Sequence, residues 1–100
     1  MVEPTRSFRI TLRAKADLIA IGRYTERAWG KRQRDKYLTE LDACFKLLAR
    51  NAKLGRPRPE IQEGYYSFSQ GSHVIFYIIA EKHIDIIGIP HKSMDIPNFF

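Results

Sequence analysis

The residues best suited to chemistry lie near the end of the chain, just after a run of strand-like residues. His91 and Lys92 follow Pro90 directly, and Met94 and Asp95 come shortly after them. A histidine can act as an acid or a base near neutral pH, and a lysine can stabilise developing negative charge. His91 can equally be a structural histidine that bonds a backbone carbonyl, and the spacing leaves both interpretations open.

Other kinds of chemistry lack their residues. His73, His83 and His91 do not show the close spacing of metal ligands, and Cys44 is the only cysteine. Cys44 falls in a predicted helix near its apolar side, where a cysteine is more often a small core residue than a nucleophile. The glycines form no phosphate-binding motif. We therefore expect no metal, no cofactor and no catalytic residue set.

The chain ends in two phenylalanines, Phe99 and Phe100, after Ile96, Pro97 and Asn98. Side chains this large and apolar either fold back onto the core or offer an apolar contact to a partner. The sequence leaves both possibilities open.

Two strands must position these groups. Residues 73–80 are almost continuously apolar, β-branched and aromatic, which is typical of a strand buried on both faces in the middle of a sheet. Residues 81–83 form a polar break short enough for a hairpin. Residues 84–89 return beside the first strand, and Pro90 ends the second because proline cannot donate to the ladder.

The rest of the chain is expected to cover this sheet. After a polar lead over residues 1–6, expected to be poorly ordered at its start, residues 7–12 alternate with Phe8, Ile10 and Leu12 on one face and predict a half-buried strand. Residues 14–29 have helical spacing, and Gly30 suits a left-handed cap. A second apolar stripe, from Leu38 to residue 52, predicts another helix. Residues 55–59 form a stiff basic connector, and residues 61–69 a further strand.

The element order is therefore β-α-α-β-β-β. Short links predict an antiparallel meander for the last three strands, with the helical hairpin on one face of the sheet. The fold class is α+β, in a single domain over residues 1–100. No stretch has the roughly 20 apolar residues of a membrane span, and no signal-peptide pattern is present, so we expect a cytoplasmic protein.

Positive charge is concentrated in the first part of the chain. The net charge is +6, and residues 1–60 contain fifteen of the 17 Lys and Arg but seven of the 11 Asp and Glu. This asymmetry indicates a polyanionic partner, either nucleic acid or an acidic protein segment, although solvated helix faces would look the same.

Several motifs together resemble the ParE branch of the ParE/RelE toxin superfamily, the toxin half of bacterial toxin–antitoxin modules. They are Tyr24 with Trp29 and Gly30, residues 54–57, residues 72–77 and residues 89–95. The closing His-x-x-Met-Asp motif, from His91 to Asp95, is the most specific. The likeness covers nearly the whole chain.

The resemblance implies a small basic toxin that holds DNA gyrase, or topoisomerase IV, on cleaved DNA without itself catalysing a reaction. It also implies a ParD-like antitoxin, in a hetero-oligomer, whose helix lies along the helical hairpin and whose extended backbone lies beside the sheet. The predicted toxicity residues are His91, Lys92, Met94, Asp95, Phe99 and Phe100. Candidates for electrostatic contact with DNA or antitoxin are Arg32, Arg34, Arg56 and Arg58.

Two other functions remain open. The sister RelE-like branch cuts messenger RNA on the ribosome, usually with arginine on the central strand and a cationic cluster near the last strand. Here those positions hold Val74 and Gly88, which leaves His91 and Lys92 as the only possible pair. This deficit favours inhibition by binding over RNA cleavage. The second alternative is an inactive module that only binds its antitoxin or regulates its own operon.

Overall fold

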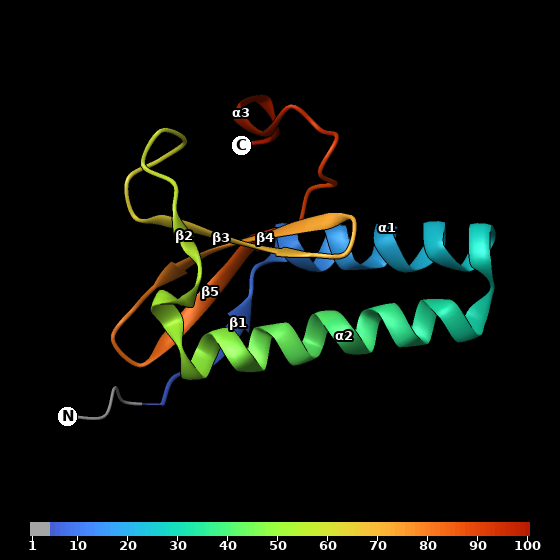
Figure 1. Cartoon of the computed structure of the whole chain (residues 1–100), viewed down its shortest axis with the longest axis horizontal. Coiled ribbons are helices and arrows are strands. Elements are labelled where there is room, and N and C mark those ends of the chain that lie inside the picture. The colour runs from blue at the N-terminus through green and yellow to red at the C-terminus, as the bar shows by residue number, and fades with distance from the viewer. Residues whose placement is uncertain (1–4) are drawn as a thin grey trace.

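The computed structural model describes residues 5–100; residues 1–4 of the polar lead lie outside the described residues. Two long helices and a five-stranded sheet confirm the predicted α+β class and the order of the main elements (Figure 1). The elements are β1 (Ser7–Ile10), α1 (Leu12–Trp29), α2 (Lys31–Arg50), the 3-10 turn η1 (Ala52–Leu54), β2 (Arg56–Pro57), β3 (Tyr65–Gln70), β4 (His73–Ile79), β5 (His83–Gly88) and α3 (Ile96–Phe99).

The sheet has the strand order β1-β5-β4-β3-β2, so β4 is its central strand, as predicted. The pairs β3–β4 and β4–β5 are antiparallel and form the expected meander. The pair β1–β5 is parallel, which makes the sheet mixed. Residues 56 and 57 pair with β3 as the short edge strand β2, within the segment predicted to be only a connector.

Helix α1 starts earlier than its apolar pattern indicates. The hydroxyl of Thr11 accepts a hydrogen bond from the Ala14 N–H at 3.2 Å and caps the helix. Leu12 is therefore the first helical residue rather than the last residue of a strand, and its side chain is 89% exposed. The predicted inward-facing position of Leu12 is wrong because the cap ends β1 at Ile10.

Gly30 joins the two helices with a φ of 91°, a backbone conformation that favours glycine. It ends α1, as predicted, and α2 begins at the next residue. The helices run side by side as an antiparallel hairpin whose tip projects beyond the sheet (Figure 1).

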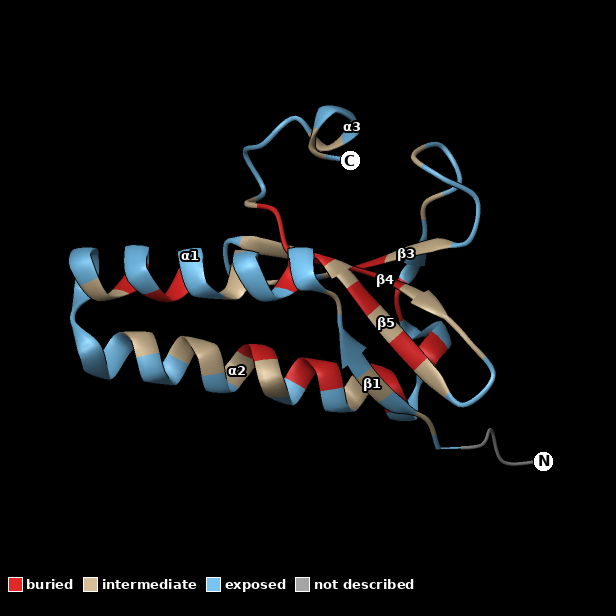
Figure 2. Cartoon of the chain, turned by 180° about the vertical axis from the view of Figure 1, so that it is seen from behind, coloured by how far each residue is buried: buried red, intermediate tan, exposed pale blue. Residues whose placement is uncertain are grey.

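The core lies between the hairpin and one face of the sheet, where buried positions of both layers meet (Figure 2). Ile75 and Tyr77 of β4 pack there with Leu41, Phe45 and Leu48 of α2, and all five side chains are at most 2% exposed. Among the described residues, no helix is long and apolar enough to cross a membrane.

The remaining strand boundaries differ from the prediction by a few residues. β3 starts at Tyr65 rather than residue 61, because residues 58–65 fold into turns with hydrogen bonds such as Arg58 N–H to the Tyr65 carbonyl at 2.7 Å. His83, expected in the hairpin turn, is the first residue of β5 and pairs with Ser7. Neither shift changes which face a core residue occupies.

Candidate functional site

The segment after β5 continues beside the central strand rather than leaving the sheet. The Val74 N–H donates to the Pro90 carbonyl at 2.9 Å, and the Lys92 N–H donates to the Ser72 carbonyl at 2.9 Å. The backbone of His91 is thus fixed by hydrogen bonds on both sides. Beyond it, Lys92, Met94 and Asp95 are exposed to solvent, available to a partner.

His91 has a partner that the sequence did not indicate. Its backbone bridges to His73, and the two imidazole rings meet edge to face with centroids 5.3 Å apart. His73 Nδ1 lies 2.7 Å from the hydroxyl of Tyr37 on α2. Burial, and secondarily the charge of His91, lowers the pKa of His73 to about 4, so this ring is neutral at pH 7. The spacing of these histidines in the sequence gives no sign of this contact.

The two terminal phenylalanines fold back onto the face of the sheet opposite the core. The Phe100 ring packs edge to face against Phe76 of β4 at 5.0 Å and against Tyr65 of β3 at 5.3 Å. Below them, a Cβ on Gly88 would lie 2.9 Å from Phe99 Cε1 and 3.1 Å from Phe100 Cε1. Gly88 therefore provides the space in which the rings lie. A glycine within a strand is the sequence signal for such a close approach.

Arg13, at the start of α1, holds this tail in place. Its guanidinium donates to the Phe99 carbonyl and lies over the Phe99 ring, 4.1 Å from the centroid, a cation–π contact. No local pattern could reveal this contact, because the two residues come from opposite ends of the chain. We call Lys92, Met94, Asp95, Phe99 and Phe100 the C-terminal surface; they are five of the six predicted toxicity residues, and the sixth, His91, lies against His73.

The four predicted arginines do not form one patch. Arg34 pairs with Glu26 and Asp35, and Arg58 pairs with Glu60 at 2.6 Å. Arg32 and Arg56 have exposed side chains at opposite ends of the molecule. The hydrogen bond from Arg58 also lowers the pKa of the Glu60 carboxyl. Arg34 and Arg58 thus already neutralise acids of this chain, and Arg32 and Arg56 remain the better candidates for an external anion.

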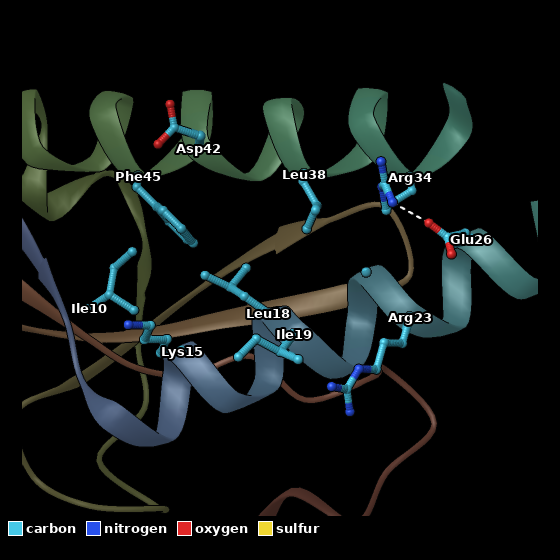
Figure 3. A pocket seen from close by; sticks show the side chains of 11 residues that line it. Ile10, Lys15, Leu18, Ile19, Arg23, Glu26, Arg34, Leu38, Asp42 and Phe45 are labelled. Atoms are coloured by element: carbon cyan, nitrogen blue, oxygen red, sulfur yellow. Dashed lines mark hydrogen bonds and ion pairs between the residues drawn. The ribbon is translucent and has the colours of Figure 1, made fainter. Parts of the chain in front are cut away.

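A groove of about 580 Å³ lies along the helical hairpin, on the side bordered by β1. Leu38 and Phe45 point from α2 toward Leu18 on α1, and Ile10 closes one end (Figure 3). Ile19 borders the groove with 49% of its surface exposed. Its rim carries Lys15, Arg23, Glu26, Arg34 and Asp42.

Strand β1 offers a free backbone edge next to this groove. The N–H groups of Ser7 and Thr11 donate to β5-side carbonyls of Lys82 and Ile86, each at 3.1 Å. Because backbone groups alternate along a strand, those of Phe8 and Ile10 point away from β5. β1 is the last strand of the sheet on this side, so these groups are available to an added strand.

The sheet face at Gly88 is lined mainly by aromatic rings. Phe76, Phe99 and Phe100 fill it with aromatic rings, and the guanidiniums of Arg13 and Arg58 lie over those rings. Within residues 5–100, no three His, Cys, Asp or Glu side chains lie close enough together to hold a metal ion. Cys44 is buried, as predicted, with its pKa raised by burial.

Comparison with known proteins identifies the family of the chain. Residues 8–96 match the family described as the ParE toxin of the type II toxin–antitoxin system, parDE. Toxin ParE1 of Caulobacter vibrioides is 37% identical over 90% of this chain and 93% of its own length. Toxin ParE1 of Mycobacterium tuberculosis is 38% identical over 83% of this chain and 86% of its own.

Solved structures show the same fold. A chain of the chromosomal ParDE system of P. aeruginosa superposes with a TM-score of 0.74 at 24% identity, over 87% of this chain and 96% of that one. A chain of the RelBE2 toxin–antitoxin complex of Mycobacterium tuberculosis gives 0.64 at 20% identity, over 89% of this chain and 100% of that one. From the family match and the curated relatives, the chain belongs to the ParE toxin family of type II toxin–antitoxin systems.

Proposed function

We propose that this chain inhibits DNA gyrase, or the related topoisomerase IV, by binding the enzyme on cleaved DNA, and that a ParD-like antitoxin neutralises it. The supporting observation is the C-terminal surface. Where the sister nucleases carry a cation on the last strand, Gly88 stands under the rings of Phe99 and Phe100. A surface of aromatic rings flanked by exposed Lys92, Met94 and Asp95 suits recognition of a large protein partner.

The absence of catalysis is part of the same proposal. RNA cleavage through the 2′-hydroxyl needs a base together with cations for the charge on the phosphorane. His91 and Lys92 are the candidate base and cation. The ring next to His91 is that of His73, which is uncharged because its pKa is lowered, so His73 adds no positive charge to this pair. The nearby guanidinium of Arg13 lies over the ring of Phe99 rather than facing a site for a phosphate. Inhibition by binding needs none of these groups.

The groove along the hairpin is the proposed antitoxin site. Its apolar floor fits one face of an amphipathic helix, and the neighbouring free edge of β1 fits an extended segment. The chain carries a net charge of +6, which favours an acidic partner and increases its rate of association. The expected assembly is a hetero-oligomer of toxin and antitoxin.

The target is tested by expressing the chain in cells that carry a DNA-damage reporter. Inhibition of gyrase predicts that the reporter is induced, that cells form filaments, and that transcripts stay intact. Arrested translation with cleaved transcripts and a silent reporter would contradict the proposal and indicate a ribosome-dependent endonuclease. Unchanged viability would also contradict it, and would leave a module that only binds its antitoxin.

A further inference from the structure

A second hollow surface lies between α1 and the segment after β5 and extends toward the tip of the hairpin, away from the groove of Figure 3. Two adjoining hollows of about 430 and 510 Å³ share Tyr24, His73 and His91 as lining residues. Trp29 of α1 and Gln33 of α2 are among the other residues that line the second hollow. We call this region, lined by Tyr24, Trp29, Gln33, His73 and His91, the histidine cleft. The first hollow is also lined by Asp17, Met94 and Phe99, so the cleft adjoins the C-terminal surface but not the antitoxin groove.

Hydrogen bonds at Tyr37 determine where the proton of His73 lies. The Tyr37 oxygen accepts from the Ser72 N–H at 3.1 Å and lies 3.0 Å from the Gln70 carbonyl and 2.7 Å from His73 Nδ1. The hydroxyl has one hydrogen, and the Gln70 carbonyl can only accept it. All three contacts are hydrogen bonds only if the hydroxyl donates to Gln70 and His73 Nδ1–H donates to the hydroxyl. In neutral His73, Nε2 is then an acceptor.

His91 has the opposite tautomer. The Ser93 N–H can only donate, and it lies 3.1 Å from His91 Nδ1, with the Ser93 hydroxyl 2.8 Å from the same atom. Nδ1 is therefore the acceptor, and Nε2 carries the hydrogen. Within residues 5–100, neither Nε2 has a hydrogen-bond partner. In the same residues every buried side-chain nitrogen or oxygen has a partner, so these two unpartnered atoms are not buried. Both atoms are consequently accessible, on rings that line the cleft.

The cleft thus presents a hydrogen-bond donor and an acceptor close together, beside two exposed aromatic rings. Trp29 is 74% exposed and Tyr24 is 62% exposed, large values for side chains of this size. Exposed cations surround the tip of the hairpin, whereas the acids there, Glu26 and Asp35, are both paired with Arg34. These cations are Arg27, Lys31, Arg32 and Lys36.

We propose that the histidine cleft binds an unstacked base of a single-stranded nucleic acid. Every nucleobase has a flat face that stacks on aromatic side chains and an edge that carries donors and acceptors side by side. The flanking phosphates would lie against the cations of the hairpin tip. An acidic peptide would use these cations but has no flat donor–acceptor edge to match the two histidines. A metal ion is disfavoured because His91 Nε2 carries a hydrogen.

The fluorescence of Trp29, the only tryptophan, reports stacking directly. The full-length chain is titrated with a thymidine 12-mer, a uridine 12-mer, a 12-base-pair duplex and a 12-mer of abasic sugar-phosphate units. The proposal predicts saturable quenching by a base-containing single strand and none by the abasic strand. Tighter binding of the uridine strand would assign the same site to RNA, and of the thymidine strand to DNA.

Substitutions separate stacking from attraction by charge. We expect Tyr24→Ala and Trp29→Ala each to lower the affinity roughly five- to a hundredfold, the effect of removing one stacking ring. Binding to Tyr24→Ala is measured by Trp29 emission, and binding to Trp29→Ala by the anisotropy of a labelled strand. His91→Asn predicts a smaller loss. Leu54→Ala, at an exposed apolar residue outside the cleft, is the matched control and predicts no change.

Equal affinity for abasic and base-containing strands would overturn the proposal, as would unchanged binding in Tyr24→Ala and Trp29→Ala. Each of these variants alters an exposed side chain, so a loss of binding would not reflect unfolding, and thermal denaturation verifies this. The assay contains no gyrase, and its outcome is therefore independent of the function proposed above.

Discussion

The hydroxyl of Tyr77 connects the centre of the sheet to the end of the helical hairpin. It donates to the Ala52 carbonyl at 2.7 Å and accepts from the Gly55 N–H at 3.0 Å, with no exposed surface on the residue. Burial raises the pKa of Tyr77 to about 12, so the donor is retained across the physiological range. One side chain therefore satisfies two backbone groups where α2 gives way to β2.

Tyr77→Phe removes this connection without changing the ring. The Ala52 carbonyl and the Gly55 N–H then lose their partner inside the core, and we expect the free energy of unfolding to fall by about 1–3 kcal/mol. Urea denaturation of the two proteins measures the difference. Tyr24→Phe, at a ring that is 62% exposed, is the control and predicts almost no change. An equal effect of both substitutions would show that the buried hydroxyl has no special role.

His73 predicts a dependence of stability on pH. Its pKa is about 4 in the folded chain and about 6.5 when unfolded, so between these values only the unfolded chain binds the proton. The contribution of neutral His73 to the free energy of unfolding is therefore complete above pH 6.5. It is lost as the pH decreases toward 4, which lowers the free energy of unfolding by up to about 3 kcal/mol. His73→Gln should flatten this part of the curve, as measured by denaturation at several pH values. The same slope in both proteins would contradict the assignment.

Among the elements, the C-terminal tail is held in position by residues that lie far from it in the sequence. Deleting residues 98–100 is expected to abolish toxicity while leaving antitoxin binding intact, because the tail and the groove are separate surfaces. Gly88→Val should act in the same direction, since a Cβ there would lie 2.9 Å from Phe99 Cε1. Growth assays and co-purification with antitoxin measure the two properties. Ser69→Val, on an exposed position of β3, is the matched control. Full toxicity of the truncated chain would refute the role of the tail.

The helical hairpin yields the complementary prediction. Ile19→Asp replaces an apolar side chain of the groove with a charged one, and we expect antitoxin affinity to fall at least tenfold because an apolar contact is lost and the carboxylate must give up water under the antitoxin helix. Leu12→Asp changes a residue that is 89% exposed and does not line the groove, and it should bind normally. Calorimetric titration with antitoxin compares them. Equal affinity would place the antitoxin elsewhere.

The elements differ in how far sequence alone could predict them. The apolar run of β4, the α2 stripe and Gly30 determine their own structure through burial and backbone preference, and each was predicted correctly. β2 was missed because two residues carry no periodicity. The contacts of Arg13 with Phe99, and of His73 with His91, depend on register and chain return, which no local pattern encodes.

At the scale of the whole molecule, the groove is separate from the other two surfaces, which adjoin each other. The chain measures 44 × 29 × 21 Å, with the groove along the hairpin, the histidine cleft between α1 and the segment after β5, and the aromatic tail on the face of the sheet opposite the core. An antitoxin in the groove and along β1 would cover a large part of one side. In the proposed function, the bound antitoxin would block the target by its size and by occupying the positively charged surface. It would not need to contact every toxicity residue.

The measurement that tests this account most directly is a titration of the pure chain into gyrase and supercoiled plasmid. If the chain acts by binding, linear DNA should rise with added toxin, level off near equivalence with gyrase, and revert when antitoxin is added before the DNA is trapped. Plasmid or RNA without gyrase should remain intact at every concentration. Cleavage of RNA or DNA by the chain alone, or no linear DNA with gyrase present, would contradict inhibition by binding.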